Sequence, residues 1–297
     1  MASDWKKLYP FESHYFDLDG LKYHYVDEGA GDPLVCVHGN PTWSFHWRNL
    51  ILALRGKYRV IAVDRIGCGL SDKPTNYPYR MSQHIGNLRE LLSHLKLENA
   101  TLVAHDWGGP IGVSALLYLQ HRFRRISLLN TGTFLPESVP FKLRLARSRV
   151  FGKFAVQGMN QFLKSAFKTA TVKPEIWDEA MKAGYLAPYQ SWKERCGVYG
   201  FVRDIPTSPG HPTWNMLEFL ENETVKLQSM QVQMIWGMQD WVFTPAVLEK
   251  MRKLFPRAEV HEIADAGHFV MEDAKNQVIS LVTSFLERTS ASTPDSP

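Results

Sequence analysis

The sequence predicts an α/β fold: a mainly parallel sheet with helices on both faces and one large helical insertion. Short apolar, strand-like runs alternate with helix-like runs along most of the 297 residues, which is typical of parallel sheets. Between residues 135 and 230 the strand-like runs disappear, and helical segments rich in Phe, Lys, Trp and Tyr replace them. Strand-like runs resume afterwards, so we expect the helical segment to interrupt a single sheet.

The predicted sheet has eight strands. An opening hairpin joins 14–20 to 21–29 through Asp19-Gly20, a residue pair that favours a tight turn. The other strands are expected at 34–39, 58–65, 100–105, 125–132, 232–240 and 258–265. Apolar residues at helical spacing predict helices at 44–54, at 81–97, from Trp107 onward and at 272–288.

These segments also predict the domain organisation. Residues 1–134 and 231–297 are expected to form one core domain, into which residues 135–230 are inserted as a helical cap. The last residues, 289–297, are rich in Ser, Thr and Pro, and we expect a disordered tail there.

The composition limits the classes of partner. The 34 basic and 30 acidic residues are interspersed, with a formal net charge of +4 and no basic stripe, so a nucleic-acid partner is not expected. No apolar run approaches the ~18 residues that span a bilayer, and the N-terminus lacks a charged-then-apolar signal pattern. The three cysteines have unrelated spacings, which indicates no disulfide framework. We therefore expect a cytoplasmic protein without a membrane partner.

Asp106 is the predicted nucleophile. It lies between a buried strand and a helix in Ala104-His105-Asp106-Trp107-Gly108, where small residues on either side let the chain turn sharply and hold the central side chain above the sheet. Most proteins with this turn carry Ser at its centre, but the sequence contains no G-x-S-x-G. Taken alone, Asp106 is equally consistent with the N-cap of the following helix, so the motifs around it decide.

Other motifs complete a catalytic constellation. The segment HGNP (38–41) follows a strand and is typical of a loop that supplies one backbone N–H of an oxyanion hole, with the second from Trp107. Asp240 ends another strand, and His268 lies in a loop after the last strand. Nucleophile, acid, base is the chain order expected for a triad on this kind of sheet. The sequence therefore predicts Asp106, Asp240 and His268 as the triad.

With these motifs the chain resembles the haloalkane dehalogenases of the α/β-hydrolase superfamily. The resemblance rests on HGNPTWSFHWR (38–48), DRIGCGLSDKP (64–74), AHDWGG (104–109), the Asp240 strand and the His268 loop, and it extends over essentially the whole chain. It implies the α/β-hydrolase fold, with a helical cap in the place of the insertion.

The resemblance also implies a two-step hydrolysis of carbon–halogen bonds. Asp106 would displace the halide and form an alkyl ester, which water activated by His268 would hydrolyse to an alcohol. The side-chain N–H groups of Asn40 and Trp107 would hold the departing halide, because two preorganised donors stabilise charge that develops in the transition state. The partners would thus be a small hydrophobic electrophile, water and a halide ion.

Subgroups of the family differ in the position of the acid. Some carry Glu after the strand that precedes the cap, where this chain has Asn130. Asp240 is therefore the expected acid, which indicates a subgroup whose acid follows the post-cap strand. One such subgroup includes relatives that decarboxylate β-lactones in long-chain olefin biosynthesis.

The pocket lining and any cofactor are harder to predict. The candidates for the pocket are Phe134, Phe162, Phe167 and Phe269. Phe134 and Phe269 lie beside site segments, whereas Phe162 and Phe167 are equally consistent with a cap core. No spacing of His, Cys or Glu indicates a metal site. The segment 67–69 lacks the third glycine of a dinucleotide loop, so no cofactor is expected.

Three other functions are consistent with these residues. A β-lactone decarboxylase would use Asp106 and His268 on a different electrophile. An epoxide hydrolase would also use an Asp nucleophile but needs paired cap tyrosines, for which Tyr185, Tyr189 and Tyr199 are candidates. A ligand-binding protein without turnover is the alternative from a different class. The presence of all five predicted catalytic and halide-binding residues argues against it.

Overall fold

A computed structural model describes residues 4–290, which form an eight-stranded sheet in the order β1-β2-β4-β3-β5-β6-β7-β8. The strands are β1 His14–Leu18, β2 Leu21–Glu28, β3 Pro33–Val37, β4 Arg59–Val63, β5 Ala100–His105, β6 Phe123–Leu129, β7 Gln231–Gly237 and β8 Glu259–Ile263. Strand β2 pairs antiparallel with β1 and β4, and every other pair is parallel. The predicted hairpin and the mainly parallel sheet are confirmed.

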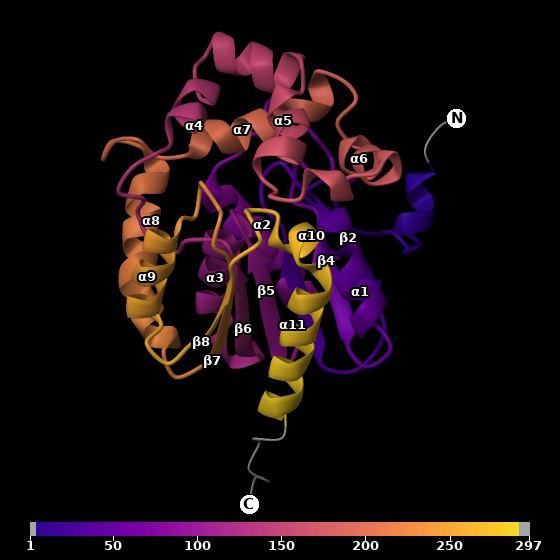
Figure 1. The fold of residues 1–297 in the computed structure, drawn as a ribbon, viewed down its shortest axis with the longest axis vertical. Coiled ribbons are helices and arrows are strands. Elements are labelled where there is room, and N and C mark those ends of the chain that lie inside the picture. Colours follow the sequence, from indigo (N-terminus) through magenta and orange to yellow (C-terminus); the bar gives the residue numbers. More distant parts are fainter. Residues whose placement is uncertain (1–3, 291–297) are drawn as a thin grey trace, which may run out of the picture.

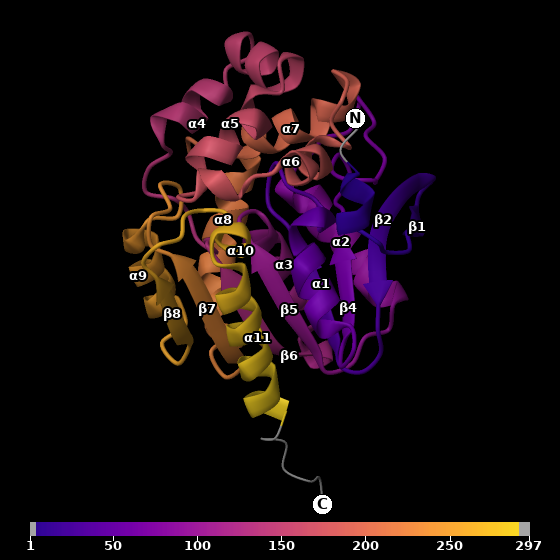
Figure 2. The same ribbon diagram turned by 45° about the vertical axis from the view of Figure 1, so that its right-hand side comes forward.

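Helices cover both faces of the sheet (Figure 1). They are α1 Arg48–Leu54, α2 Met81–His94, α3 Gly108–Tyr118, α8 Pro212–Glu223, α9 Pro245–Leu254, α10 Val270–Asp273 and α11 Lys275–Ser290. One apolar cluster lies between the sheet and α2, α3, α8 and α9, and a second contains the buried residues of α1 and α11. Figure 2 places β1 and β8 at opposite edges of the sheet. The central strands β3 and β5 are buried at every position, because both of their faces are covered.

Several strands end earlier than predicted. We expected strands to reach residues 39, 132 and 240, but β3 ends at Val37, β6 at Leu129 and β7 at Gly237. The residues beyond these ends turn away from the sheet, although their composition is compatible with a strand. They supply loops at the carboxyl edge of the sheet, where ligands bind in open α/β sheets.

The helical segment between β6 and β7 occupies two places. Its first part lies above the carboxyl edge of the sheet (Figure 1). This part comprises α4 Phe141–Ala146, the π-helical turn η4 Lys153–Gly158, α5 Gln161–Thr169, η5 Pro174–Ile176, α6 Glu179–Leu186, η6 Lys193–Arg195 and α7 Cys196–Asp204. Helix α8 instead packs beside the sheet against α2 and α3. We therefore propose that the cap ends before α8, and that only the first part of 135–230 covers the site.

The end of the chain also differs from the prediction. Helix α11 continues to Ser290, so Thr289 and Ser290, which were predicted to begin the tail, belong to its last turn. The remainder of the predicted tail, 291–297, lies outside the described residues. No helix within residues 4–290 is long and apolar enough to cross a membrane.

A buried ion pair connects the cap to the core. Arg48, at the start of α1, donates two hydrogen bonds to Glu272 of α10, with N···O distances of 2.6 and 3.0 Å. Tyr185 of α6 donates its hydroxyl proton to the same carboxylate at 2.6 Å. The Arg48 and Glu272 side chains are almost fully buried, so these protein groups replace the water that would otherwise solvate the charges.

Glu272→Ala should lower the free energy of unfolding by about 3–5 kcal/mol, because it leaves the buried charge of Arg48 unpaired. Urea titration monitored by circular dichroism would measure the loss. Glu259→Ala is the control: it removes an exposed pair with Arg288 and should cost less than about 1 kcal/mol. Equal losses in the two variants would contradict a stabilising role for the buried pair.

Candidate active site

The backbone turns sharply at Asp106, between β5 and α3. Asp106 has a φ of +51°, a conformation that is uncommon for residues other than glycine and is concentrated at functional sites. The packing around the turn leaves no room for neighbouring side chains. A Cβ on Gly108 would lie 2.0 Å from the carbonyl oxygen of Val37, and one on Gly39 would lie 2.4 Å from Asp106 Cβ. The glycines on both sides of the carboxylate are therefore required by contact.

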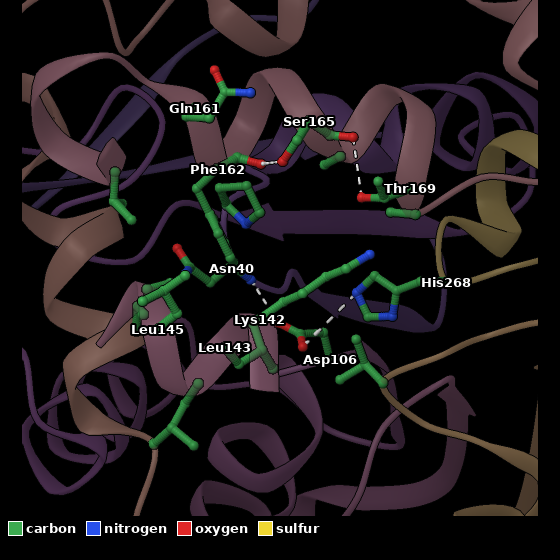
Figure 3. A pocket seen from close by; sticks show the side chains of 18 of the residues that line it. Asn40, Asp106, Lys142, Leu143, Leu145, Gln161, Phe162, Ser165, Thr169 and His268 are labelled. Carbon is green, nitrogen blue, oxygen red and sulfur yellow. Dashed lines mark hydrogen bonds and ion pairs between the residues drawn. The ribbon is translucent and has the colours of Figure 1, made fainter. Parts of the chain in front are cut away.

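The two oxygens of the Asp106 carboxylate have different surroundings. Oδ1 accepts a hydrogen bond from the backbone N–H of Asn40 at 2.7 Å, and the backbone N–H of Trp107 also bonds the carboxylate. Oδ2 lies 3.9 Å from His268 Nε2 (Figure 3). Burial raises the pKa of Asp106, and His268, the two N–H groups and Arg65 only partly oppose that rise. One oxygen is thus held by the backbone, and the other faces the imidazole.

His268 is held by Asp240, which follows β7. The imidazole Nδ1 lies 2.8 Å from Asp240 Oδ2, so a proton on Nδ1 leaves Nε2 directed toward Asp106. The backbone N–H of Val242 and the side-chain amide of Asn130 also donate to the Asp240 carboxylate, at 2.7 and 3.0 Å. Burial disfavours the imidazolium, but the Asp240 carboxylate more than offsets it and raises the pKa of His268. The structure therefore brings the three predicted triad residues together.

Asn130 has a role that the sequence did not reveal. Its Oδ1 accepts the backbone N–H of Gly237 at 2.8 Å, and its Nδ2 donates to the Gly237 carbonyl at 3.1 Å and to Asp240. Asn130 thus joins the end of β6 to the end of β7 and fixes the acid. The sequence showed only that Asn130 stands at the position where some subgroups of the family carry a catalytic Glu.

Arg65 is a second residue near the site that the sequence did not single out. It follows β4, is fully buried, and donates from Nη2 to the carbonyl of Gly39 at 2.9 Å. Its guanidinium carbon lies 4.4 Å from the centroid of the Phe201 ring, a cation–π contact. By holding the Gly39 carbonyl, Arg65 orients the loop whose next N–H contacts Asp106. A charged residue directly after a buried strand was the only signal.

A cavity of about 320 Å³ lies between this turn and the cap. Asp106, His268, Asn40 and Trp107 line it together with largely apolar side chains from α4, η4, α5 and α7 (Figure 3). Its volume and apolar character suit a small or medium-sized apolar ligand. Among residues 4–290, no group of three or more His, Cys, Asp or Glu side chains is arranged to hold a metal ion.

Two of the four predicted pocket residues line this cavity, and two do not. Phe162 and Phe269 line it. Phe134 instead belongs to the core cluster beside α9, with the ammonium nitrogen of Lys250 4.2 Å from its ring centroid. Phe167 packs against Trp177 and Tyr185 inside the cap. The structure thus does not bring Phe134 and Phe167 to this cavity, because other side chains pack against both rings.

The two predicted halide donors differ in availability. Asn40 donates from Nδ2 to the carbonyl of Val198 at 3.2 Å, and its Oδ1 has no partner among the described residues. One amide proton of Asn40 is therefore engaged by α7. The indole N–H of Trp107 has no hydrogen-bond acceptor within residues 4–290, and its ring lines the cavity. The structure brings both side chains beside Asp106.

The cap tyrosines required for epoxide opening do not line the cavity. The Tyr185 hydroxyl bonds Glu272, and the hydroxyls of Tyr189 and Tyr199 donate to backbone carbonyl groups at 3.3 and 3.0 Å. These three hydroxyls stabilise the cap and its contact with the core. They are not placed to protonate the oxygen of an epoxide bound at Asp106.

Residues 32–275 match the family described as the alpha/beta hydrolase fold. A cis-3-alkyl-4-alkyloxetan-2-one decarboxylase of Shewanella oneidensis is 40% identical over 288 residues, which cover 95% of this chain and 90% of the relative. Haloalkane dehalogenase 2 of Mycobacterium tuberculosis is 31% identical over 277 residues, 93% and 95% of the two chains. The chain belongs to the haloalkane dehalogenase family of the α/β-hydrolase superfamily.

A solved member of this family has the same fold. The crystal structure of the haloalkane dehalogenase DatA from Agrobacterium tumefaciens superposes with a TM-score of 0.83 at 25% identity, over 93% of this chain and 96% of DatA. The predicted fold class is therefore confirmed, and the protein is an enzyme of the α/β-hydrolase family. The relatives differ in the bond that they break, so the family alone leaves the substrate open.

The contact between Asp240 and His268 can be tested by titration. In the wild-type protein, NMR of the His268 ring nitrogens should give a pKa above the ordinary value of about 6.5. Asp240→Asn removes the larger of the two charges that raise this pKa and leaves burial opposed by Asp106 alone, so the pKa should fall. Glu259→Gln, which removes an exposed carboxylate elsewhere, should not change it. An unchanged His268 pKa in Asp240→Asn would contradict the assigned contact.

Proposed function

We propose that this enzyme converts a β-lactone with two alkyl substituents into an alkene and carbon dioxide through a covalent ester with Asp106. The observation that carries this proposal is the divided environment of the Asp106 carboxylate. Its Oδ1 accepts the backbone N–H of Asn40, while Oδ2 lies toward His268 at the apolar cavity. A desolvated carboxylate with one anchored oxygen is a directed nucleophile toward saturated carbon.

The choice of electrophile rests on similarity. Both decarboxylases and dehalogenases of this family are related to the chain over more than nine-tenths of its length, but the Shewanella decarboxylase is 40% identical and the Mycobacterium dehalogenase 31%. A second decarboxylase, from Xanthomonas campestris, is 33% identical over 282 residues. The higher identity to the decarboxylases favours the β-lactone as substrate. The sequence motifs alone had favoured the haloalkane.

The reaction can be written with the residues in place. Asp106 Oδ2 attacks the saturated ring carbon that is bonded to the ring oxygen. The bond between these two atoms breaks, and its electron pair stays on the oxygen, so that the opened substrate carries a carboxylate on the neighbouring carbon. The bond from that carboxylate to its carbon then breaks and releases carbon dioxide. This electron pair forms the carbon–carbon double bond as the Asp106 carboxylate departs. No water is consumed, and the nucleophile is regenerated.

The stereochemistry follows from the direction of attack. Attack from the face opposite the ring oxygen places the new Asp106–carbon bond anti to the substrate carboxylate. Loss of carbon dioxide and Asp106 from opposite faces then keeps the two alkyl groups on the same side. A cis-substituted lactone should therefore give a cis alkene.

His268 would stabilise charge in this reaction. Its raised pKa extends the pH range in which the ring is cationic, and Nε2 lies 3.9 Å from Asp106 Oδ2. An imidazolium at this position favours the carboxylate form of Asp106, which is the leaving group of the second step. In a hydrolytic reaction the neutral ring would instead activate water.

Dehalogenation is the second candidate because Trp107 and Asn40 both line the cavity beside the nucleophile. Halide would be held by the indole N–H of Trp107 and by the amide proton of Asn40 that does not bond Val198. Epoxide hydrolysis lacks the corresponding support, since the cap tyrosines bond elsewhere. A binding protein without turnover would have no chemical use for the Asp106–His268–Asp240 arrangement.

A substrate panel separates these functions. The panel contains a cis-dialkyl β-lactone, a bromoalkane and an aryl epoxide. Gas chromatography would measure alkene, carbon dioxide and diol, and a halide assay would measure bromide. We expect the release of alkene and carbon dioxide from the β-lactone to be the fastest of the three reactions. Asp106→Ala should reduce turnover of every substrate to less than about a thousandth, because nucleophile loss typically costs several powers of ten. Rapid bromide release without alkene would instead identify a dehalogenase.

The covalent step can be trapped. His268→Gln cannot activate water, so with a bromoalkane it should release about one equivalent of bromide and keep the alkyl group as an ester on Asp106. Intact-protein mass spectrometry would detect the added mass, and peptide mapping would locate it. The double variant Asp106→Ala/His268→Gln is the control and should gain no mass. A folded His268→Gln protein that binds the bromoalkane but forms no adduct would refute covalent attack on carbon–halogen bonds.

A further inference from the structure

An exposed apolar surface lies on the cap, on the side away from the sheet. The segment between α4 and α5 forms the part of the cap farthest from the strands in both views (Figures 1 and 2). Its large side chains are exposed: Phe141, Leu145, Val150, Phe151, Phe154 and Met159. Val150 is 84% and Phe141 76% exposed. We call this set the α4–η4 surface. Large exposed apolar side chains gathered in one part of the chain indicate an interaction site.

Basic side chains accompany these apolar residues. Between residues 137 and 173 the chain has eight Lys or Arg and a single acidic residue, Glu137. Seven of the basic residues form no ion pair with any part of the chain between residues 4 and 290: Lys142, Arg144, Arg147, Arg149, Lys153, Lys164 and Lys168. The surface therefore combines apolar groups with positive charge that the protein itself does not neutralise, although the net charge of the whole chain is only +4.

The α4–η4 surface continues into the cavity above Asp106. Leu145 and Phe151 belong to the exposed set and also line the cavity. Lys142, which is labelled in Figure 3, lines it as well. An apolar molecule lying against the outside of the cap would therefore have continuous apolar contact from the surface to the nucleophile.

We propose that the α4–η4 surface binds anionic lipid bilayers, with its apolar side chains among the acyl chains and its basic side chains at the phosphate groups. Charge complementarity selects this occupant. Apolar residues alone would suit a second copy of the chain, but two such surfaces would bring the unpaired cations of both copies together. A bilayer supplies acyl chains for the apolar residues and a dense anionic plane for the basic ones. Each basic residue near the bilayer surface strengthens the attraction.

Bilayer binding gives the cavity a source of substrate. If the substrate carries long alkyl chains, it partitions into membranes, and a cavity mouth at the lipid surface would receive it without passage through water. This part of the inference rests on the proposed function. Lipid binding itself does not, so the two can fail separately. The expectation of no membrane partner rested on the lack of a spanning segment. That residues 4–290 contain no spanning helix does not bear on a surface contact.

Vesicle flotation tests the proposal on the full chain. The protein should float with vesicles of phosphatidylcholine and phosphatidylserine, bind vesicles of phosphatidylcholine alone more weakly, and dissociate as salt is added. Arg149→Glu/Lys153→Glu should weaken binding to the anionic vesicles at least about tenfold, since each basic residue contributes to the attraction. Val150→Asp/Phe154→Asp should abolish binding to both kinds of vesicle. None of these residues lines the cavity.

Matched controls carry the same changes elsewhere. Phe219→Asp/Val225→Asp alters two residues of α8 and η7 (Thr224–Leu227) that are 55% and 57% exposed. Lys253→Glu/Arg257→Glu reverses the same amount of charge near α9. Both controls should bind vesicles as the wild type does, and thermal unfolding would establish that all four variants are folded.

The outcomes are decisive for the surface whatever the reaction is. Wild-type protein that fails to float at low salt, or controls that lose binding as much as the cap variants, would overturn the proposal. The proposal would also be overturned if the wild-type protein does not bind vesicles but self-associates, as measured by light scattering, and the cap variants abolish this self-association. Flotation that depends on the cap residues, in a protein that releases no alkene, would leave the surface established and refute the decarboxylase function instead.

Discussion

The close approach of two loops at Asp106 determines the rest of the site. The loop after β3 and the turn after β5 meet where Gly39 has no room for a Cβ against the Asp106 side chain. Asp106 has a positive φ at this contact, and the N–H of Asn40 bonds its Oδ1. The carboxylate is thus oriented before any substrate arrives, and little reorganisation remains for the reaction. Arg65 secures the arrangement by bonding the Gly39 carbonyl.

Electrostatics then divides the roles of the buried ionisable groups. Two carboxylates, Asp106 and Asp240, share one imidazole, but they contact different nitrogens at different distances, 3.9 and 2.8 Å. Asp240 also accepts hydrogen bonds from Val242 and Asn130, whereas Asp106 keeps one oxygen open to the cavity. Asp240, whose oxygens accept more hydrogen bonds, orients the imidazole ring, and Asp106 can react. Burial strengthens this difference, because a missing hydrogen bond costs more free energy in the low dielectric of the interior than in water.

The sequence predicted what depends on local pattern. Hairpin, parallel strands and helical insertion follow from the periodicity of apolar residues, and the triad follows from residue types at strand ends. The prediction failed where a residue's partners are distant in sequence. Phe134 and Phe167 are aromatic residues in or near segments that form the site. Phe134 nevertheless packs against Lys250, and Phe167 packs against Trp177. Arg65 depends on a carbonyl 26 positions away, which no local pattern records. Strand ends were misplaced for a related reason, because the residues that leave the sheet resemble those within it.

The cap is attached unequally to the core. Helix α6 is bound through Tyr185 to the Arg48–Glu272 pair, and its Gly184 carbonyl accepts the indole N–H of Trp43. In contrast, α4 and η4 pack chiefly against other cap elements. Substitutions on the α6 side therefore disturb folding, whereas those on the α4 side change mainly the walls of the cavity. The α4 side can therefore change the shape of the cavity at low cost in stability, while the α6 side keeps the cap attached to the core.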